Sequence, residues 1–309
     1  MKISEKLKII KKLSGKTQES IAKDLGVSFV TFNSWINEKS NPHKSKIENI
    51  DKLLVKFTGI SLISEKENVY TKKDIINKKL EKYGNILKLI TGRTDLYDQF
   101  ILSLTYHTNR IEGSTLTEDE TAAIIFRNEV IANKDLVEHL EAKNHQTAIK
   151  FLFNYLLNNK KIDENLILKL HGLLMSGIRE DAGQYRRHGV RIVGSNVPTA
   201  NYLKISELMK DLVKEINNKE KDIIKYATII HSKFEQIHPF SDGNGRIGRL
   251  ILCAMLLRDN YPPAVIEIKE KNLYLSYLRK SQLKGDSASL EDFMCDFILN
   301  SFKIIEGLY

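Results

Sequence analysis

The stretch HSKFEQIHPFSDGNGRIGRL, residues 231–250, decides the fold expected of this chain. Apolar residues at helical spacing lead up to His238, and Pro239 disfavours helical backbone in the residue before it. A second apolar helix is predicted to begin at Arg246, after a short glycine-rich loop. A helix–loop–helix unit is therefore expected at the centre of the fold.

The loop between these two helices is predicted to bind an anion. Gly243, Asn244 and Gly245 form a flexible backbone at a helix N-terminus, where free N–H groups and the helix dipole attract negative charge. Arg246 and Arg249 lie three residues apart, so both can face the same anion. This combination indicates a site for phosphate chemistry.

Two residues beside the loop add reactive groups. The carboxylate of Asp242 is suited to hold Mg²⁺ against phosphate oxygens, and His238 is a base that titrates near neutral pH. A metal cluster of His231, Glu235 and His238 is an alternative. However, the helix should end near His238, and the spacing is not the HExxH of zinc peptidases. We therefore expect His231 and Glu235 to be structural residues.

This stretch resembles the Fic family signature HPF-x-D/E-GNGR-xx-R, with all nine fixed positions matched. The matching residues are His238, Pro239, Phe240, Asp242, Gly243, Asn244, Gly245, Arg246 and Arg249. The resemblance covers about residues 85–300 and implies a mostly helical bundle. The alternating pattern within 183–199 predicts a small β-hairpin. In the family such a hairpin is a flap that adds a target peptide as an extra strand; here it would contain Val190, Ile192 and Val193.

The resemblance also implies a role for each residue. His238 would deprotonate a hydroxyl group of a target protein, and Asp242 would bind Mg²⁺. The phosphates of ATP would contact Gly243, Asn244, Gly245, Arg246 and Arg249. Tyr274 and Gln282 would contact adenine. The reaction implied is transfer of AMP; Doc-like kinases, which transfer the γ-phosphate, have a different loop in place of GNGR.

A second motif suggests that the site is inhibited from within the chain. Thr108, Glu112 and Gly113 match the family's inhibitory pattern S/T-xxx-E-G/N. Thr108 and Glu112 share one helix face, and Gly113 can end the helix. The resemblance implies that Glu112 pairs with Arg249 and keeps it from the γ-phosphate. The alternative is an ordinary surface helix.

The first 60 residues predict a separate small domain. Thr17 can cap a helix from Gln18 to Leu25, and Ser28 can cap a second helix that reaches about Asn37. This pair resembles the helix-turn-helix of phage-repressor-type DNA-binding domains. The resemblance implies that bases are read by Ser28, Phe29, Val30, Asn33 and Ser34. Because two of these are apolar, a pair of helices that docks a protein is the alternative.

Charge and composition agree with this division. Of the 309 residues, with a net charge of +9, the first 60 hold twelve lysines against six acidic residues, which favours an anionic partner such as DNA. We expect a DNA-binding-like domain over 1–60, a linker over 61–72 and a Fic domain over 73–309. The inhibitory helix is expected around residues 100–113.

The remaining features favour a cytoplasmic protein that does not contact a membrane. No run reaches the roughly 18 apolar residues of a membrane span, and the lysine-rich start is unlike a secretory signal. Cys253 and Cys295 are expected to be buried in a reducing compartment. The sequence thus predicts an autoinhibited protein adenylyltransferase, able to form homo-oligomers. A nucleotide-sensing transcriptional regulator and a de-AMPylase, with Glu112 orienting a water, stay as alternatives.

Overall fold

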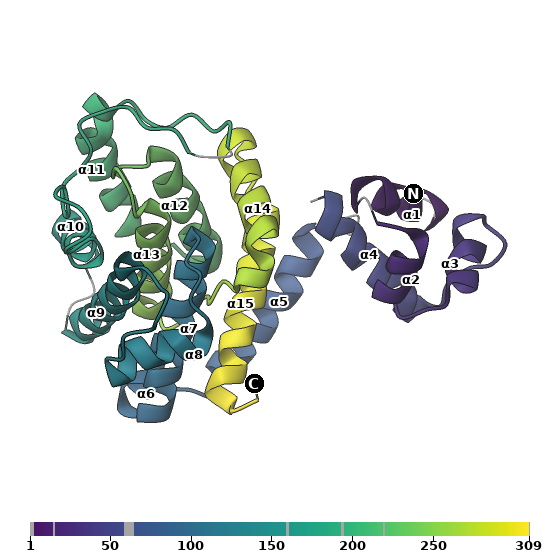
Figure 1. Ribbon diagram of the computed structural model, residues 1–309, viewed down its shortest axis with the longest axis horizontal. Helices are drawn as coiled ribbons and strands as arrows, with labels where there is room; N and C mark the ends of the chain where they lie inside the picture. The colour runs from purple at the N-terminus through teal and green to yellow at the C-terminus, as the bar shows by residue number, and fades with distance from the viewer. Residues whose placement is uncertain are drawn as a thin grey trace. The chain divides into compact units, whose positions relative to one another are not determined.

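The computed structural model describes residues 3–14, 16–58, 65–158, 161–192, 195–218 and 220–308 (Figure 1). The chain divides into two compact units, Met1–Asn68 and Val69–Tyr309. The described residues form helices and loops and contain no β-strand. The prediction of a mostly helical fold is therefore confirmed.

The N-terminal unit is a bundle of short helices. They are α1 (Ile3–Ser14), α2 (Gln18–Asp24), α3 (Phe29–Ile36) and α4 (Lys44–Thr58). As predicted, the side chain of Thr17 caps α2 and that of Ser28 caps α3, each accepting a hydrogen bond from the backbone three residues on. Gly26 makes the turn between them with φ +62°, a conformation that side chains disfavour.

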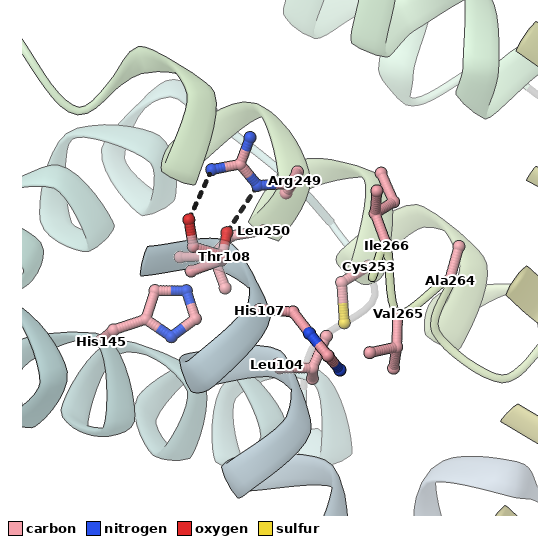
Figure 2. Close-up of a pocket in the computed structure, with 10 residues that line it drawn as sticks. All are labelled: Leu104, His107, Thr108, His145, Arg249, Leu250, Cys253, Ala264, Val265 and Ile266. Carbon is pink, nitrogen blue, oxygen red and sulfur yellow. Dashed lines mark hydrogen bonds between the residues drawn. The ribbon is translucent and has the colours of Figure 1, made fainter. Parts of the chain in front are cut away.

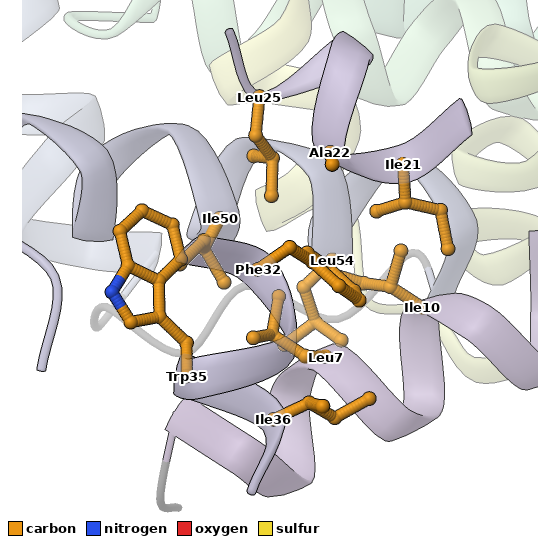
Figure 3. Close-up of a cluster of buried hydrophobic side chains, with 10 residues drawn as sticks. All are labelled: Leu7, Ile10, Ile21, Ala22, Leu25, Phe32, Trp35, Ile36, Ile50 and Leu54. Carbon is orange, nitrogen blue, oxygen red and sulfur yellow. The ribbon is translucent and has the colours of Figure 1, made fainter. Parts of the chain in front are cut away.

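All four helices contribute to one small core in this unit (Figure 3). Phe32 and Trp35 of α3 are buried there, and Ala22 supplies a small side chain on α2. The ammonium of Lys46 donates to the carbonyl oxygens of Leu25 (2.9 Å) and Gly26 (3.0 Å), which satisfies acceptors at the end of α2. The turn between α2 and α3 is thus held from outside as well as by its own caps.

The larger unit surrounds α12 and α13 with the other helices. Its elements are α5 (Glu65–Leu80), α6 (Ile86–Gly92), α7 (Thr94–Glu112), α8 (Glu118–Ala122), a π-helical turn (Ala123–Arg127), α9 (Leu136–Asn158), α10 (Glu164–Leu174), a 3₁₀ turn (Tyr202–Lys204), α11 (Ile205–Ile216), α12 (Ile223–Ile237), α13 (Asn244–Arg258), a 3₁₀ turn (Ile268–Glu270), α14 (Lys271–Lys284) and α15 (Ala288–Glu306). Of the predicted linker over 61–72, residues 61–64 lie outside the described residues and residues 65–72 are helical. This helical stretch is rich in Glu and Lys, which have high helix propensity.

Helix α13 lies at the centre of this unit because it is buried on nearly every side. Helices α6, α7, α9, α10 and α12 pack against it. Gly248 lets α12 approach closely, since a Cβ there would collide with Glu235. Cys253 of α13 and Cys295 of α15 are buried and unpaired, as expected. A helix covered in this way holds the loop at its N-terminus in a fixed position.

The prediction of a β-hairpin over 183–199 is wrong for the residues that the structure describes. Residues 183–192 and 195–199 form a loop without strand pairing. Two hydrogen bonds join its sides, from Thr199 Oγ1 to the Val190 carbonyl (2.8 Å) and from Ser195 N to the Ile192 carbonyl (3.1 Å). Val193 lies outside the described residues. An isolated two-stranded ribbon is only marginally stable in water, so the alternating pattern alone does not produce one.

Within the described part of the chain, no helix is both long enough and apolar enough to cross a membrane.

Candidate active site

His238 lies at the point where α12 ends. Its backbone adopts the left-handed conformation (φ 52°, ψ 61°), which is uncommon for a residue other than glycine. The ring Nδ1 is 3.2 Å from the carbonyl oxygen of Glu235. Because a carbonyl can only accept, Nδ1 carries the proton, and the lone pair of Nε2 is left for other partners. Burial lowers the pKa of His238, which favours the neutral form that a base requires.

The loop after His238 is held by its own asparagine. Asn244 Oδ1 accepts from the backbone of Phe240 (2.8 Å), and Asn244 Nδ2 donates to the Phe240 carbonyl (2.9 Å). Phe240 itself is fully buried and stacks on His171 with ring centres 3.7 Å apart. Both ends of the Asn244 side-chain amide bond to Phe240, so this side chain fixes the loop, and its phosphate contact stays a prediction.

A second support comes from the segment 171–186, which sequence reasoning did not connect to the loop. His171 Nδ1 accepts from Gly183 N (2.8 Å), so Nε2 donates to the carbonyl of Asp242 (3.1 Å), 71 residues further along the chain. Ser241 Oγ donates to Asp181 (2.5 Å). Burial lowers the pKa of His171 to about 4, so the ring stays neutral.

The anion nest, residues 243–245, forms the start of α13. Gly243 has φ +76°, and Asn244 and Gly245 begin the helix two residues earlier than predicted. Asp242 Oδ1 accepts from Gly243 N (2.6 Å), and the Asp242 side chain is 54% exposed. A carboxylate thus lies beside free N–H groups at a helix N-terminus, where phosphate oxygens and a cation can meet.

These donors fit Mg²⁺ shared with a phosphate ligand. In the described ranges, no three or more His, Cys, Asp or Glu residues are grouped so as to hold a metal alone. Mg²⁺ commonly binds through one or two carboxylates together with substrate phosphates and water. Asp242 supplies such a carboxylate, which bonds the protein at Oδ1 while its side chain stays half exposed.

Arg246 is nearly fully buried. Its Nη1 pairs with Glu141 of α9 (2.6 Å), and its Nη2 is 3.8 Å from Asp242 and 4.0 Å from Met175 Sδ. To bind phosphate oxygens as predicted, the Arg246 guanidinium would have to contact them while it stays paired with Glu141. In the structure Arg246 joins α13 to α9 and lies under the nest.

Arg249 is held by two residues of α7. Its Nη2 is 2.5 Å from Glu112 Oε1. Its Nε donates to Thr108 Oγ1 at 2.5 Å, a contact drawn in Figure 2. The Arg249 side chain is 10% exposed and that of Glu112 is 34% exposed. Burial raises the pKa of Glu112, but the charge and hydrogen bond of Arg249 outweigh it, so the pKa is lowered and the carboxylate stays ionised.

Glu112 also reaches the nest itself. A Cβ at Gly245 would collide with Glu112 Oε1, so the carboxylate lies directly against the backbone of the nest. As predicted, α7 ends at Glu112, and Gly113 caps it in the left-handed conformation (φ +115°). The end of α7 therefore brings a negative charge to the place where an anionic ligand would bind.

A small cavity lies behind this contact (Figure 2). Its volume is about 20 Å³, and it lies among Thr108, Arg249, His107, His145 and apolar side chains. His145 Nδ1 is 3.2 Å from Thr105 Oγ1, and burial lowers the pKa of His145 far below its ordinary value. Such a space holds roughly one water molecule, so it is not a nucleotide site.

The predicted adenine contacts lie mostly in the core. Tyr274 is fully buried, with its hydroxyl 2.6 Å from His231 Nε2, and Gln282 is half-buried and donates to the Ser232 carbonyl at 3.4 Å. Glu235, next to them, is buried, and burial raises its pKa to about 8. The packing of α12 against α14 covers the Tyr274 ring, and its contact with adenine stays a prediction. His231 and Glu235 are core residues, as expected.

The residues predicted to read DNA lie at the start of α3. Phe29 is 44% exposed and Val30 more so. The polar side chains already have partners within the unit: Ser28 caps α3, Asn33 Oδ1 accepts from Asn37 (2.8 Å), and Ser34 bonds Ser40 (2.7 Å). The exposed face here is therefore partly apolar.

The helices of the larger unit surround the nest and the histidine beside it, and this helical fold is Fic-like. Residues 161–256 match the family model described as "Fic/DOC family". The protein adenylyltransferase Fic of Aedes aegypti is 32% identical over 196 residues, 62% of this chain and 39% of that protein. The protein adenylyltransferase Fic of Nematostella vectensis is 32% identical over 224 residues, which are 67% of this chain and 49% of that protein. The chain thus spans less than half the length of these relatives.

Solved structures show the same fold. Fic-1 from C. elegans superposes with a TM-score of 0.69 at 24% identity and covers 94% of this chain and 85% of its own. A Fic family protein from Desulfovibrio desulfuricans G20 superposes with a TM-score of 0.63 at 23% identity. The match covers 78% of this chain and 74% of that protein's chain.

Proposed function

We propose that this chain is a protein adenylyltransferase, which transfers AMP from ATP to a Tyr, Thr or Ser hydroxyl group of a target protein or of itself. The observation that carries the proposal is the position of His238 beside the anion nest, within one loop that matches the Fic signature at every position. The relatives named protein adenylyltransferase add support.

In this mechanism the residues of one loop divide the work. His238 Nε2 takes the proton of the acceptor hydroxyl, whose oxygen attacks the α-phosphorus. The bond from that phosphorus to the bridging oxygen breaks, and pyrophosphate leaves. The N–H groups of the nest bind the phosphates and hold the reacting atoms in line. A positioned base typically contributes roughly 10²- to 10⁴-fold to a rate.

Asp242 is the residue that would hold Mg²⁺ beside the nest. The ion would neutralise part of the charge on the phosphate oxygens. Asp242 suits this role because one of its oxygens is fixed by Gly243 N while its side chain stays half exposed.

We further propose that Glu112 inhibits the enzyme. The support is its ion pair with Arg249 and its position against the nest. A carboxylate there repels the phosphates of ATP and holds the guanidinium that would otherwise bind the γ-phosphate. ATP then binds poorly or in a pose in which transfer is slow.

For the N-terminal unit we propose contact with DNA through α3. The support is the excess of lysine in residues 1–60 and the exposed start of α3. Fluorescence anisotropy with duplex DNA at increasing salt is the test. Binding that weakens steeply with salt is expected; no binding at low salt would leave protein docking as the role of this unit.

The proposed transfer is tested with ATP labelled at the α-phosphate. The samples are the wild-type chain, Glu112→Gly, and Glu112→Gly combined with His238→Ala. Strong labelling of Glu112→Gly that is lost with His238→Ala is expected. Labelling absent from all three, although ATP binds, would overturn AMP transfer and favour a nucleotide sensor. Release of AMP from a labelled protein would favour the de-AMPylase.

A further inference from the structure

Arg186 is a buried cation bonded to carbonyl oxygens. It is 3% exposed, and among the described residues it forms no ion pair with a carboxylate. Its Nε donates to His238 O (2.7 Å), Nη1 to His188 O (2.6 Å), and Nη2 to Ala200 O (2.6 Å) and more weakly to Ile237 O (3.4 Å). Its backbone N–H adds a bond to the Pro239 carbonyl (3.0 Å).

These bonds join three pieces of backbone at one guanidinium. One piece is the end of α12, with Ile237 and His238. The other two are His188 and Ala200, where the loop of residues 188–200 begins and ends. The planar fork of arginine presents five N–H donors in fixed directions, which a lysine ammonium cannot reproduce. Arg186 therefore fixes both ends of that loop relative to the backbone of His238.

The end of α12 needs such a partner. The last carbonyl groups of a helix have no hydrogen-bond donor within the helix. A cation near them is favourable because of the helix dipole. The left-handed backbone of His238 is a sparsely populated conformation, which persists only where the surroundings hold it. Arg186 supplies the partner through side chain and backbone on both sides of His238, at Ile237 and at Pro239.

We propose that Arg186 is a positioning residue for the transfer reaction, which holds His238 in its working orientation and fixes His188 and Ala200 beside it. This inference rests on the proposed role of His238 as the base. Neither the nest nor Arg249 bonds to Arg186, so we expect the binding of ATP to depend on it little.

The charges around His238 provide a readout that a purely structural role would leave unchanged. Burial is the largest effect and lowers the pKa of His238, and the charge of Arg186 lowers it further. The Glu235 carbonyl and the carboxylates of Glu112 and Asp242 act in the opposite direction. A neutral residue in place of Arg186 should therefore raise the pKa of His238, whereas lysine should keep it low.

The test uses the full chain in the Glu112→Gly background. Arg186→Gln, Arg186→Lys and the matched control Arg187→Gln are compared; Arg187 is the exposed neighbour with the same charge. We measure kcat and KM for ATP against pH, and the pKa of the His238 ring by NMR, with its signal assigned by its loss in His238→Ala. Amide deuterium uptake of the 187–202 peptide reports on the loop.

We expect kcat to fall roughly ten- to a hundredfold in both Arg186 variants, as a small misplacement of a reacting group does, with KM for ATP within about twofold. The acidic limb of the pH profile should move to higher pH in Arg186→Gln alone. The 187–202 peptide should take up deuterium faster in both variants. Arg187→Gln should behave as its parent.

Folded Arg186 variants with the kcat, His238 pKa and deuterium uptake of Arg187→Gln would overturn the proposal. If Arg186→Gln does not fold, Arg186→Lys decides by the same kcat and uptake criteria. If the Glu112→Gly parent transfers no AMP, the proposed function fails. The pKa of His238 and the uptake of the loop then still decide whether Arg186 holds this histidine.

Discussion

The Glu112 carboxylate and the Arg249 guanidinium are 2.5 Å apart, although the two residues lie 137 positions apart in the sequence. Glu112 is the last residue of α7, and Arg249 is in the second turn of α13. Thr108, one turn before Glu112, accepts a second hydrogen bond from the same guanidinium. Because both partners are on one face of α7, a shift of this helix would break both contacts together. Under the proposed function, the end of α7 controls access to Arg249.

Replacement of Glu112 by glutamine tests the charge of this contact with little change of shape. We expect AMP transfer to rise about ten- to a hundredfold, equivalent to about 1.4–2.8 kcal/mol. The increase should be limited because the Glu112 side chain is one-third exposed and its charge is partly screened. Initial rates with labelled ATP measure it, with the exposed Glu81→Gln as control. Equal rates in both variants would contradict an inhibitory role for the carboxylate.

Thr108 should contribute a smaller share of the inhibition. Thr108→Val keeps the shape but removes the hydroxyl that accepts from Arg249 Nε. A hydrogen bond to a charged group is worth roughly 1.5–3 kcal/mol. Thr108→Val would remove this stabilisation from the inhibited state alone. We therefore expect transfer to rise about threefold to tenfold in initial-rate assays.

Thr108→Ser is the matched control because it retains the hydroxyl. It should behave like the wild-type chain. A rate in Thr108→Val no higher than in Thr108→Ser would show that the hydroxyl does not hold Arg249 in the inhibited state.

The buried Glu235 predicts a pH dependence of stability. Its pKa is about 8 in the folded state, mainly because of burial, against an ordinary value of 4.5. Between these values the folded state binds a proton that the unfolded state has lost. The free energy of unfolding should then fall as pH rises through this window, by up to about 1.4 kcal/mol per unit. Glu235→Gln removes the effect.

Urea unfolding at several pH values between about 5 and 8 measures this difference. Circular dichroism is the suitable signal, because the single tryptophan, Trp35, lies in the N-terminal unit and would not report on α12. The stability of Glu235→Gln relative to wild type should increase with pH. A constant difference across the range would mean that Glu235 is ionised in the folded protein.

The sequence predicted those features that are local. Thr17 and Ser28 cap helices through bonds to residues three positions away. Pro239 disfavours helical backbone at the residue before it, His238, where α12 ends. Gly113 ends α7 for a similar reason. Each depends on a few adjacent residues, so pattern and spacing are sufficient. The Glu112–Arg249 pair was predicted from the family resemblance, because spacing cannot join residues 137 positions apart.

The features that sequence reasoning missed depend on distant partners. His171 bonds Asp242, 71 positions away in the sequence, and Arg186 bonds His238, 52 positions away. Glu141 pairs with Arg246, 105 positions away. Tyr274 is covered by the packing of α12 against α14, which no local pattern records. The expected hairpin failed for the opposite reason: its alternation is local, but a ribbon needs a third strand or a helix to stabilise it.

The carboxylate of Asp242 predicts how the reaction depends on Mg²⁺. Asp242→Asn keeps an oxygen that can accept from Gly243 N, so the loop should stay in place while the negative charge is lost. We expect the Mg²⁺ concentration for half-maximal transfer to rise at least about tenfold, because Mg²⁺ prefers charged oxygen ligands. The titration is made in the Glu112→Gly background at saturating ATP. Asp211→Asn, an exposed carboxylate on α11, is the control for the charge change. Thermal melting confirms that both variants fold, and identical Mg²⁺ curves for the two would show that Asp242 does not hold the ion.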